Sequence, residues 1–231
     1  MSDITITIDG KECKGQKGQM ITEVAEANGI YIPTLCDFKG LVPAGTCRIC
    51  TVKINGRNMA ACTTPADDGM VIENDVPALQ DMRKALVEML FVEGNHMCPT
   101  CEKSGNCDLQ ALGYRYQMMA PRFPFMFPIR DIDASAPKVI LETNRCIQCL
   151  RCTRGVKSAD GKSIFGLVAR GGETIISADK ELAAKMTDEE AQKAMDLCPV
   201  GAILKKEVGF QVPIGQRKYD SEPIGSDIEG K

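Results

Sequence analysis

Twelve cysteines and a single histidine constrain this chain of 231 residues more than any other feature. Eleven of the cysteines and the histidine form three groups of four, separated along the chain. The first group is Cys36, Cys47, Cys50 and Cys62; the second is His96, Cys98, Cys101 and Cys107; the third is Cys146, Cys149, Cys152 and Cys198. Cys13 alone lies outside them, and we expect it to be a packing or exposed residue without a role. Three sets of four metal-ligand side chains predict three metal centres.

Composition narrows the class of protein further. The N-terminus has no basic head before an apolar segment, which argues against a secretory signal and for a cytoplasmic chain, where disulfides are not kept. No apolar run approaches the roughly 18 residues of a membrane helix. A net charge of -3 argues against nucleic-acid binding. The one histidine lies among cysteines, which argues against a Ser–His–Asp or Cys–His catalytic site.

The first 76 residues are expected to form a small mixed domain, residues 1–76. Strands are expected at residues 3–8, 51–54 and 70–72, the first of them from its alternation of apolar and polar residues. Asp9-Gly10 predicts a hairpin turn after the first strand. Thr22 is expected to cap a short helix that ends at Asn28-Gly29, with Val24 and Ala27 facing inward.

A second helix is expected from Pro77 to Gly94 and begins a small domain at residues 77–117. Its apolar face would consist of Leu79, Met82, Leu86, Met89 and Leu90. Residues 118–136 contain prolines between phenylalanines, which predicts an extended connector.

The last domain is expected at residues 137–207, with a strand at residues 138–141. Thr187 and Glu190 have capping-box spacing, so a helix is expected from there to Leu197. The tail, residues 208–231, is rich in Gly, Pro and charge, and we expect it to be frayed or to lie against a partner.

The first group has the spacing C-x10-C-x2-C-x11-C. Its first gap is longer than that of plant ferredoxins, but a loop, a CxxC and a late fourth cysteine are retained. Gly40, Pro43 and Gly45 would let backbone amides turn toward sulfur. We expect a [2Fe-2S] cluster; structural zinc is the alternative, although zinc sites usually pair two CxxC knuckles.

The third group matches the first three cysteines of the bacterial run C-x2-C-x2-C-x3-C-P. Val156 stands where the fourth cysteine of that run would be, and that cysteine ligates the other cluster in two-cluster ferredoxins. Cys198, followed by Pro199, is therefore the expected fourth ligand, and this segment is expected to hold one [4Fe-4S] cluster.

Three arginines lie within or beside the run from Cys146 to Cys152: Arg145, Arg151 and Arg154. Two interpretations remain open at this point. The arginines are ordinary solvated surface charges, or they offset the negative charge of the cluster and raise its reduction potential.

In the second group, Cys98-x2-Cys101-x5-Cys107 followed by Asp108-Leu109-Gln110 resembles the His(Cys)3 cluster motif. That motif occurs in the large iron–sulfur subunit of complex I, in [FeFe] hydrogenases and in the diaphorase part of NAD-reducing [NiFe] hydrogenases. The order of all three groups is similar to these families over residues 1 to 207, as is CPVGA at residues 198–202. The resemblance implies a second [4Fe-4S] cluster with His96 as its fourth ligand.

The histidine departs from the commonest form of this motif. The family pattern places it four residues before the first cysteine, where this chain has Gly94, whereas His96 is two residues before Cys98. Residues two apart in an extended segment point to the same side, about 6.6 Å apart, which would serve two corners of one cluster. The alternative is a polar surface histidine.

The resemblance implies an α+β fold: a β-grasp [2Fe-2S] ferredoxin-like domain, a small helical His(Cys)3 domain and a bacterial-ferredoxin-like [4Fe-4S] domain. The chain contains neither a GxGxxG nor a Walker loop, so NAD and flavin are expected on partners, and no catalytic residue is assigned.

Among these families, this chain most resembles the small diaphorase subunit of a soluble NAD-reducing [NiFe] hydrogenase. The resemblance implies an electron-relay subunit without an active site of its own. Its partners would be a flavin/NAD-binding diaphorase subunit and the small and large [NiFe] hydrogenase subunits. The alternatives are an iron–sulfur subunit of a complex I-like NADH dehydrogenase or of an NAD-dependent formate dehydrogenase, and a zinc scaffold without redox function.

Overall fold

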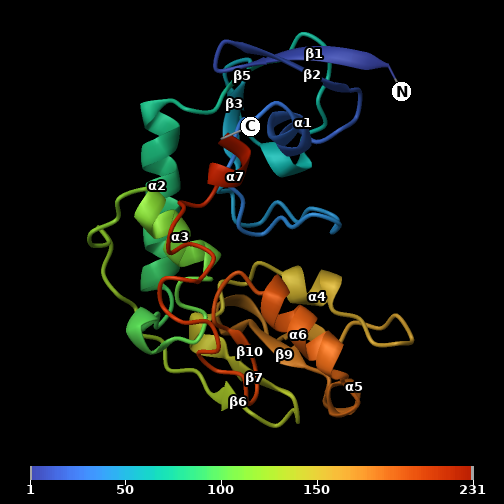
Figure 1. Cartoon of the computed structure of the whole chain (residues 1–231), viewed down its shortest axis with the longest axis vertical. Coiled ribbons are helices and arrows are strands. Elements are labelled where there is room, and N and C mark those ends of the chain that lie inside the picture. The colour runs from blue at the N-terminus through green and yellow to red at the C-terminus, as the bar shows by residue number, and fades with distance from the viewer. Residues whose placement is uncertain (1, 230–231) are drawn as a thin grey trace.

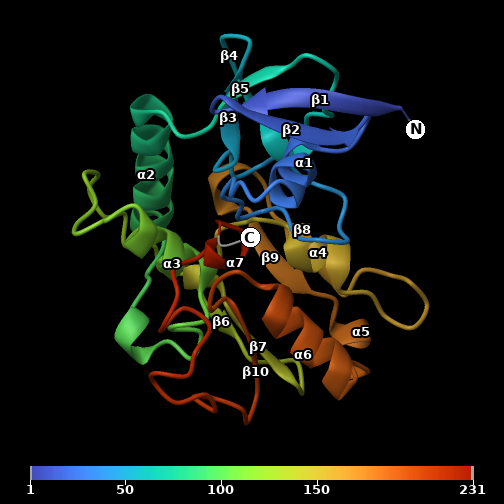
Figure 2. The ribbon, with the colours of Figure 1, turned by 45° about the horizontal axis from the view of Figure 1, so that its top comes forward.

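A mixed five-stranded sheet forms the N-terminal part of the computed structural model, which describes residues 2–229. Its strands are β1 (Asp3–Ile8), β2 (Lys11–Gln16), β3 (Thr51–Ile54), β4 (Arg57–Ala60) and β5 (Val71–Glu73). The strand order is β2-β1-β5-β3-β4, with β1 and β5 parallel and the other pairs antiparallel. The helix α1 (Ile21–Ala27) packs beside this sheet, as Figures 1 and 2 show. This is the mixed α and β architecture that the resemblance implied.

The first strand follows the alternation in the sequence, with Ile4, Ile6 and Ile8 buried, and Asp9-Gly10 forms the expected turn, both with positive φ. The predicted cap of α1 was wrong. The helix begins one residue before Thr22, and the Glu23 carboxylate accepts a hydrogen bond from the Met20 amide at 2.8 Å.

The inward face of α1 also differs from the prediction. Val24 is buried as expected, but Ala27 is exposed and Ala25 is buried in its place.

A long helix, α2 (Pro77–Val92), carries the chain away from the sheet, and α3 (Asp108–Arg115) packs against it (Figure 1). Pro77 occupies its first turn, as predicted. Its inward face differs from the predicted apolar stripe, because only Leu79 of that stripe is buried. The residues that α2 buries are Leu79, Arg83, Val87, Glu88 and Val92.

Two charged residues on this face are held by partners, although the Arg83 Nε and Glu88 Oε1 atoms have none among the described residues. The Arg83 guanidinium donates to the carbonyl oxygens of Asn74 and Thr51, at 3.0 and 2.8 Å, and Glu88 pairs with Arg122. Buried charge of this kind is tolerated because it is hydrogen-bonded. The apolar stripe therefore identified only part of the packed face, in which Leu79 is buried and Leu86 and Leu90 pack against the larger core.

The C-terminal part combines two small sheets with three helices. The sheets are β10 (Ile203–Lys205), β7 (Val139–Glu142) and β6 (Ile132–Asp133), and β8 (Phe165–Val168) with β9 (Ile175–Ala178). The helices are α4 (Arg151–Gly155), α5 (Lys180–Ala184) and α6 (Asp188–Leu197), and 3-10 turns lie at Thr143–Arg145 and Gly171–Glu173. Two further 3-10 turns lie earlier in the chain, at Ala61–Thr63 and Cys98–Thr100.

The capping box predicted for the helix before Cys198 is present. Thr187 accepts from the Glu190 amide at 3.1 Å, and Glu190 accepts from the Thr187 amide at 2.8 Å. The residues between α3 and β6 contain no helix, as the prolines predicted.

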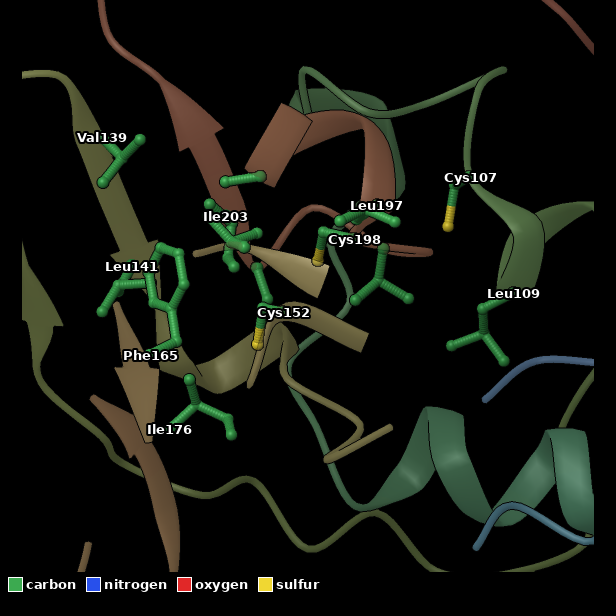
Figure 3. Close-up of a cluster of buried hydrophobic side chains, with 14 of the residues drawn as sticks. Cys107, Leu109, Val139, Leu141, Cys152, Phe165, Ile176, Leu197, Cys198 and Ile203 are labelled. Atoms are coloured by element: carbon green, nitrogen blue, oxygen red, sulfur yellow. The ribbon is translucent and has the colours of Figure 1, made fainter. Parts of the chain in front are cut away.

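Two hydrophobic cores fill the molecule. The smaller core lies under the N-terminal sheet. The larger core joins residues of the second and third groups, including Cys107, Cys152 and Cys198 (Figure 3). Leu35 and Ile49, which precede Cys36 and Cys50, also belong to the larger core. All three ligand groups therefore adjoin one body of apolar side chains.

Part of the tail packs on the chain itself, which corrects the expectation of a frayed segment, whereas contact of its exposed part with a partner stays a prediction. Tyr219 donates from its hydroxyl to the Asp108 carboxylate at 2.7 Å, and Arg115 donates to the Ile224 carbonyl at 2.8 Å. The tail ends in α7 (Ser226–Glu229) near the N-terminal sheet (Figures 1 and 2). Its polar composition is compatible with order because α3 supplies specific partners.

In the part of the chain that the structure describes, no helix combines the length and the apolar character needed to cross a membrane.

Ile224 anchors the tail, with 8% of its surface exposed, whereas Ile214 in the same tail is 85% exposed. We expect Ile224→Ser to release the tail, because the substitution places a hydroxyl in an apolar contact. Limited proteolysis with mass spectrometry should then show faster cleavage after residue 208. Ile214→Ser is the matched control and should leave the cleavage rate unchanged; equal cleavage of both variants would contradict the docking of the tail.

Candidate metal centres

The four cysteines of the first group lie together where the long loop before β3 meets the turn after β4. The Cys50 and Cys62 sulfurs are 3.3 Å apart, and both side chains are buried. Cys36, also buried, is within hydrogen-bonding reach of the Cys47 and Cys62 thiols. The structure thus brings together all four residues that the spacing selected.

Backbone amides point at the sulfurs of this group. The amide of Cys47 faces the Cys36 sulfur, that of Ile49 faces the Cys47 sulfur, and that of Cys62 faces the Cys50 sulfur. Hydrogen bonds from Cys47 and Cys62 lower the pKa of Cys36 below the ordinary thiol value, and the pKa of both donors is raised in return. N–H groups aimed at sulfur stabilise the thiolate form that binds metal.

Two glycines shape the loop of this group. Gly40 and Gly45 both adopt positive φ, at 86° and 66°. A side chain at Gly45 would also meet Thr63, which follows Cys62, at 3.0 Å. The loop therefore needs glycine at this position to approach the turn that carries Cys62.

The second group surrounds a cavity between the end of α2 and the start of α3. His96, Cys98, Cys101 and Cys107 all line it. Cys107 is the N-cap of α3, and its sulfur accepts a hydrogen bond from the Gln110 amide at 3.4 Å. The histidine that the sequence could place only through a resemblance therefore shares a cavity with the three cysteines.

The imidazole of His96 has the features of a metal ligand. Its Nε2 atom is buried and has no hydrogen-bond partner among the described residues. The ring hydrogen-bonds to the backbone at Leu90, which orients it, and burial lowers the pKa of His96 to about 4. The ring is therefore neutral at pH 7 and presents an unused nitrogen lone pair, which is the form that coordinates metals.

Gly94 explains how His96 can lie two residues from the first cysteine. A Cβ atom at position 94 would come within 2.6 Å of the His96 Nε2 atom. Because Gly94 has no side chain, the imidazole of His96 occupies the space beside it. The two departures from the family pattern, glycine at one position and histidine at the other, are therefore structurally linked.

Gly201, from the CPVGA segment, closes the second cavity from the other side. A Cβ atom there would clash with the Cys101 sulfur and lie 3.3 Å from the Lys103 side chain. The amide of Asp108 donates to the Pro199 carbonyl at 2.8 Å, which holds the same two segments together. A segment attached to the third group thus forms part of the wall of the second.

The third group surrounds a separate, mostly apolar cavity. Cys146, Cys149, Cys152 and Cys198 line it together with Leu141, Ile147, Ile176 and Val200. Cys152 on α4 and Cys198 at the end of α6 lie next to each other within the larger core (Figure 3). Gln148 and Leu150 adopt positive φ, at 50° and 60°, which turns the backbone between successive cysteines. Val156 is fully buried in the core.

Burial sets the proton affinity of the second and third groups. It raises the pKa of Cys107 and of Cys149 to about 12 and that of Cys146 to about 11. Without metal these side chains are neutral thiols, which pack like small apolar groups. A bound cation would displace the protons and stabilise the thiolates.

Cys13 lies apart from all three groups, as predicted. It is fully buried in the smaller core, and burial raises its pKa.

Within residues 2–229, no three His, Cys, Asp or Glu side chains converge as the ligands of one metal ion would. The fit to a metal centre rests on the shared cavities, the unpartnered His96 nitrogen and the space left by Gly201.

Three regions of the chain match families of known iron–sulfur domains. Residues 2–77 match the 2Fe-2S iron-sulfur cluster binding domain. Residues 83–122 match the NADH-ubiquinone oxidoreductase-G iron-sulfur binding region, and residues 136–204 match the ferredoxin-like domain of NADH-quinone oxidoreductase subunit 3. Each matched region contains all four candidate ligands of one group.

Individual proteins are similar over nearly the whole chain. The gamma subunit of the NAD-reducing hydrogenase HoxS of Cupriavidus necator is 50% identical over 96% of this chain and 95% of its own length. A chain in the crystal structure of an NAD+-reducing [NiFe]-hydrogenase in the H2-reduced state superimposes with a TM-score of 0.89 at 40% identity, covering 96% of this chain and 95% of that one. A subunit of an NADH-quinone oxidoreductase of Rhizobium meliloti is 35% identical over 98% of this chain, but the match covers only 29% of the length of that protein.

We expect Gly201→Ala to lower the metal content of the second group, because the added methyl group would meet the Cys101 sulfur. Iron analysis of the purified chain should show a lower iron content, and thermal unfolding should show a lower unfolding temperature. Gly166→Ala is the matched control, since a Cβ atom at Gly166 has no neighbour within 4 Å. An unchanged iron content in Gly201→Ala would contradict the close approach of the two segments.

Proposed function

The chain belongs to the family of the gamma subunit of the NAD-reducing hydrogenase HoxS, and on this basis we propose that it relays electrons between a flavin/NAD(H) subunit and a [NiFe] hydrogenase module. The observation that supports this most strongly is 50% identity that extends over 96% of the chain and 95% of the relative. The crystal-structure match is to a chain of an NAD+-reducing [NiFe]-hydrogenase, at 40% identity.

A 2Fe-2S domain and 4Fe-4S binding domains are present in the chain. We propose one [2Fe-2S] cluster on Cys36, Cys47, Cys50 and Cys62, and two [4Fe-4S] clusters, one on His96, Cys98, Cys101 and Cys107 and one on Cys146, Cys149, Cys152 and Cys198. When bound, such clusters take up and release single electrons.

The chain's own residues hold these sites and keep water from them. Burial of Cys36, Cys50 and Cys62 excludes solvent from the first group, and backbone amides face its sulfurs. His96 offers a neutral ring nitrogen in the second group. The apolar walls of the third cavity lower the local dielectric, which strengthens every charge interaction there.

We further propose the division of the chain made from the sequence. Residues 1–76 hold the first group, residues 77–117 the second and residues 137–207 the third, with a connector at residues 118–136. The tail, residues 208–231, is a fifth segment.

The chemistry of the relay implies particular partners. Hydride donors and hydrogen give two electrons at a time, whereas an iron–sulfur cluster passes one. A flavin subunit that binds NAD(H) would convert pairs into single electrons at one end, and the small and large hydrogenase subunits would act on hydrogen at the other. The chain would thus work as a subunit without its own active site, in the cytoplasm, within a hetero-oligomer.

A complex I-like assembly is the second candidate. The Rhizobium meliloti protein supports it through 35% identity over 98% of this chain, although the match covers only 29% of that protein. A formate dehydrogenase subunit would share the same relay logic. A zinc scaffold is disfavoured by the matches to iron–sulfur families.

The isolated chain should contain ten irons, because one [2Fe-2S] and two [4Fe-4S] clusters hold two, four and four. Anaerobic iron, sulfide and zinc analysis checks this. His96→Ala should change the spectrum and stability of one [4Fe-4S] cluster only, and the control Cys13→Ala should keep all ten irons. Stoichiometric zinc would refute the cluster assignment, and an unchanged [4Fe-4S] signal in His96→Ala would refute ligation by His96.

The native complex should contain FMN and nickel and should reduce NAD+ with hydrogen, whereas the isolated chain should neither oxidise NADH nor take up hydrogen. Affinity purification from the source organism, followed by cofactor analysis and a hydrogen-dependent NAD+ reduction assay, measures this. A complex with molybdenum or a quinone-reducing membrane arm, and without nickel, would favour the second candidate. NADH oxidation by the isolated chain would contradict the relay role itself.

A further inference from the structure

The three arginines of the third run do not behave as solvated surface charge. The side chain of Arg151 is 4% exposed and that of Arg145 is 15% exposed. Arg145 and Arg154 each contact a cysteine of another ligand group, and Arg151 contacts residues close in sequence to the cysteines of both other groups. The sequence had suggested at most an effect on the third group, whose first three cysteines lie near these arginines in the chain.

Arg145 reaches the second group, although it directly precedes Cys146 of the third. Its Nη1 atom lies 3.5 Å from the Cys101 sulfur and donates toward it. The same atom is 3.4 Å from the Glu102 carboxylate and 3.4 Å from the Gly201 carbonyl oxygen. A guanidinium N–H directed at a ligand sulfur favours the more negative state of the metal centre.

Arg151 reaches both other groups from its place between Cys149 and Cys152. Its Nη1 atom donates to the Asp108 carboxylate at 3.0 Å, and Asp108 directly follows Cys107. Its guanidinium carbon lies 5.3 Å from the ring centre of Phe38, two residues after Cys36. One buried cation therefore contacts the loops of the first and second groups.

Arg154 joins the third group to the first. Its Nη2 atom donates to the Cys36 carbonyl oxygen at 2.6 Å and to the Cys149 carbonyl oxygen at 3.3 Å. Its Nη1 atom donates to the Val42 carbonyl oxygen, in the same loop as Cys36. No contact of Arg154 with the second group is found among the hydrogen bonds and ion pairs of residues 2–229.

We propose that Arg145, Arg151 and Arg154 are positioning residues that fix the three sites relative to one another, and that Arg145 also sets the reduction potential of the cluster in the second group. This inference rests on the proposed function, because it requires clusters at these sites. The geometry assigns different targets to the arginines: Arg145 acts on the second group, and Arg154 on the first and third.

Electrostatics fixes the sign of the effect. Reduction adds one negative charge to a cluster, and a nearby fixed positive charge stabilises that state more strongly in a buried site than in water. Removal of the Arg145 charge should therefore make the cluster of the second group harder to reduce. A purely structural contact would have no such dependence on charge.

The test is an EPR-monitored redox titration of the cluster-loaded chain, with the signal of the second group identified by its change in His96→Ala. In Arg145→Gln we expect the equilibrium constant for reduction of the second-group cluster to fall roughly tenfold, because loss of a hydrogen bond to a charged group has an effect of about this size. A tenfold change corresponds to a reduction potential lower by about 59 mV for one electron. Arg145→Lys keeps the charge and should restore most of the potential.

Two further variants act as controls. Arg154→Gln should leave the second-group signal unchanged and shift the signals of the first or third group. Arg170→Gln removes an exposed arginine of the C-terminal part and should shift none of the signals.

Outcomes that contradict the inference are distinct from failure of the proposed function. If the wild-type chain holds its clusters and Arg145→Gln leaves the second-group potential unchanged, the inference is wrong. It is also wrong if Arg145→Gln and Arg145→Lys lower that potential equally, or if Arg154→Gln alone shifts it. A wild-type chain without these cluster signals would instead refute the proposed function.

Discussion

Each candidate metal-binding group brings four side chains to one place, and the arrangement of the other elements follows from this convergence. In the third group, Cys198 lies far along the chain from Cys146, and α6 delivers it back to the loop. In the first group, a long loop and a turn after β4 meet at the four sulfurs. The short elements of this chain act mainly to carry ligands to these points.

The three sites are not independent modules, although each falls in its own sequence region. Gly201 belongs to the third region but leaves space for the Cys101 sulfur of the second. Leu35 and Ile49, which flank cysteines of the first group, are buried in the core shared by the other two. The buried thiols are part of this core, because neutral thiols cost little to bury while thiolates would require a cation. We therefore expect metal loading, as proposed for these groups, to be coupled to folding.

Several of these features could be predicted from the sequence, because they depend on local spacing. The grouping of the cysteines, the first hairpin and the Thr187 capping box follow from residues close together in the chain. The structure shows the hairpin and the capping box, and it brings the residues of each group to one place. The burial of the two charged residues of α2 could not be predicted, because Arg83 and Glu88 are buried through partners distant in sequence.

The order of the tail was not predicted and the role of the histidine stayed open, both for the same reason. The tail is ordered by Asp108 and Arg115, which no local pattern of Gly, Pro and charge reveals. The position of His96 depends on the space left by the missing side chain at Gly94. The sequence alone allowed His96 to be either a cluster ligand or a polar surface residue. Contacts of individual side chains in three dimensions thus account for most of what the sequence did not predict.

The relay role requires that each of the three groups hold a multi-iron cluster with the ligands named above. Anomalous X-ray diffraction at the iron edge, on crystals of the cluster-loaded chain, locates the iron without any assumption about its ligands. We predict three separate iron-rich peaks, one within each group, with the second bonded to the His96 Nε2 atom. Fewer than three peaks, a signal at the zinc edge in their place, or a second cluster with His96 turned away would contradict this assignment.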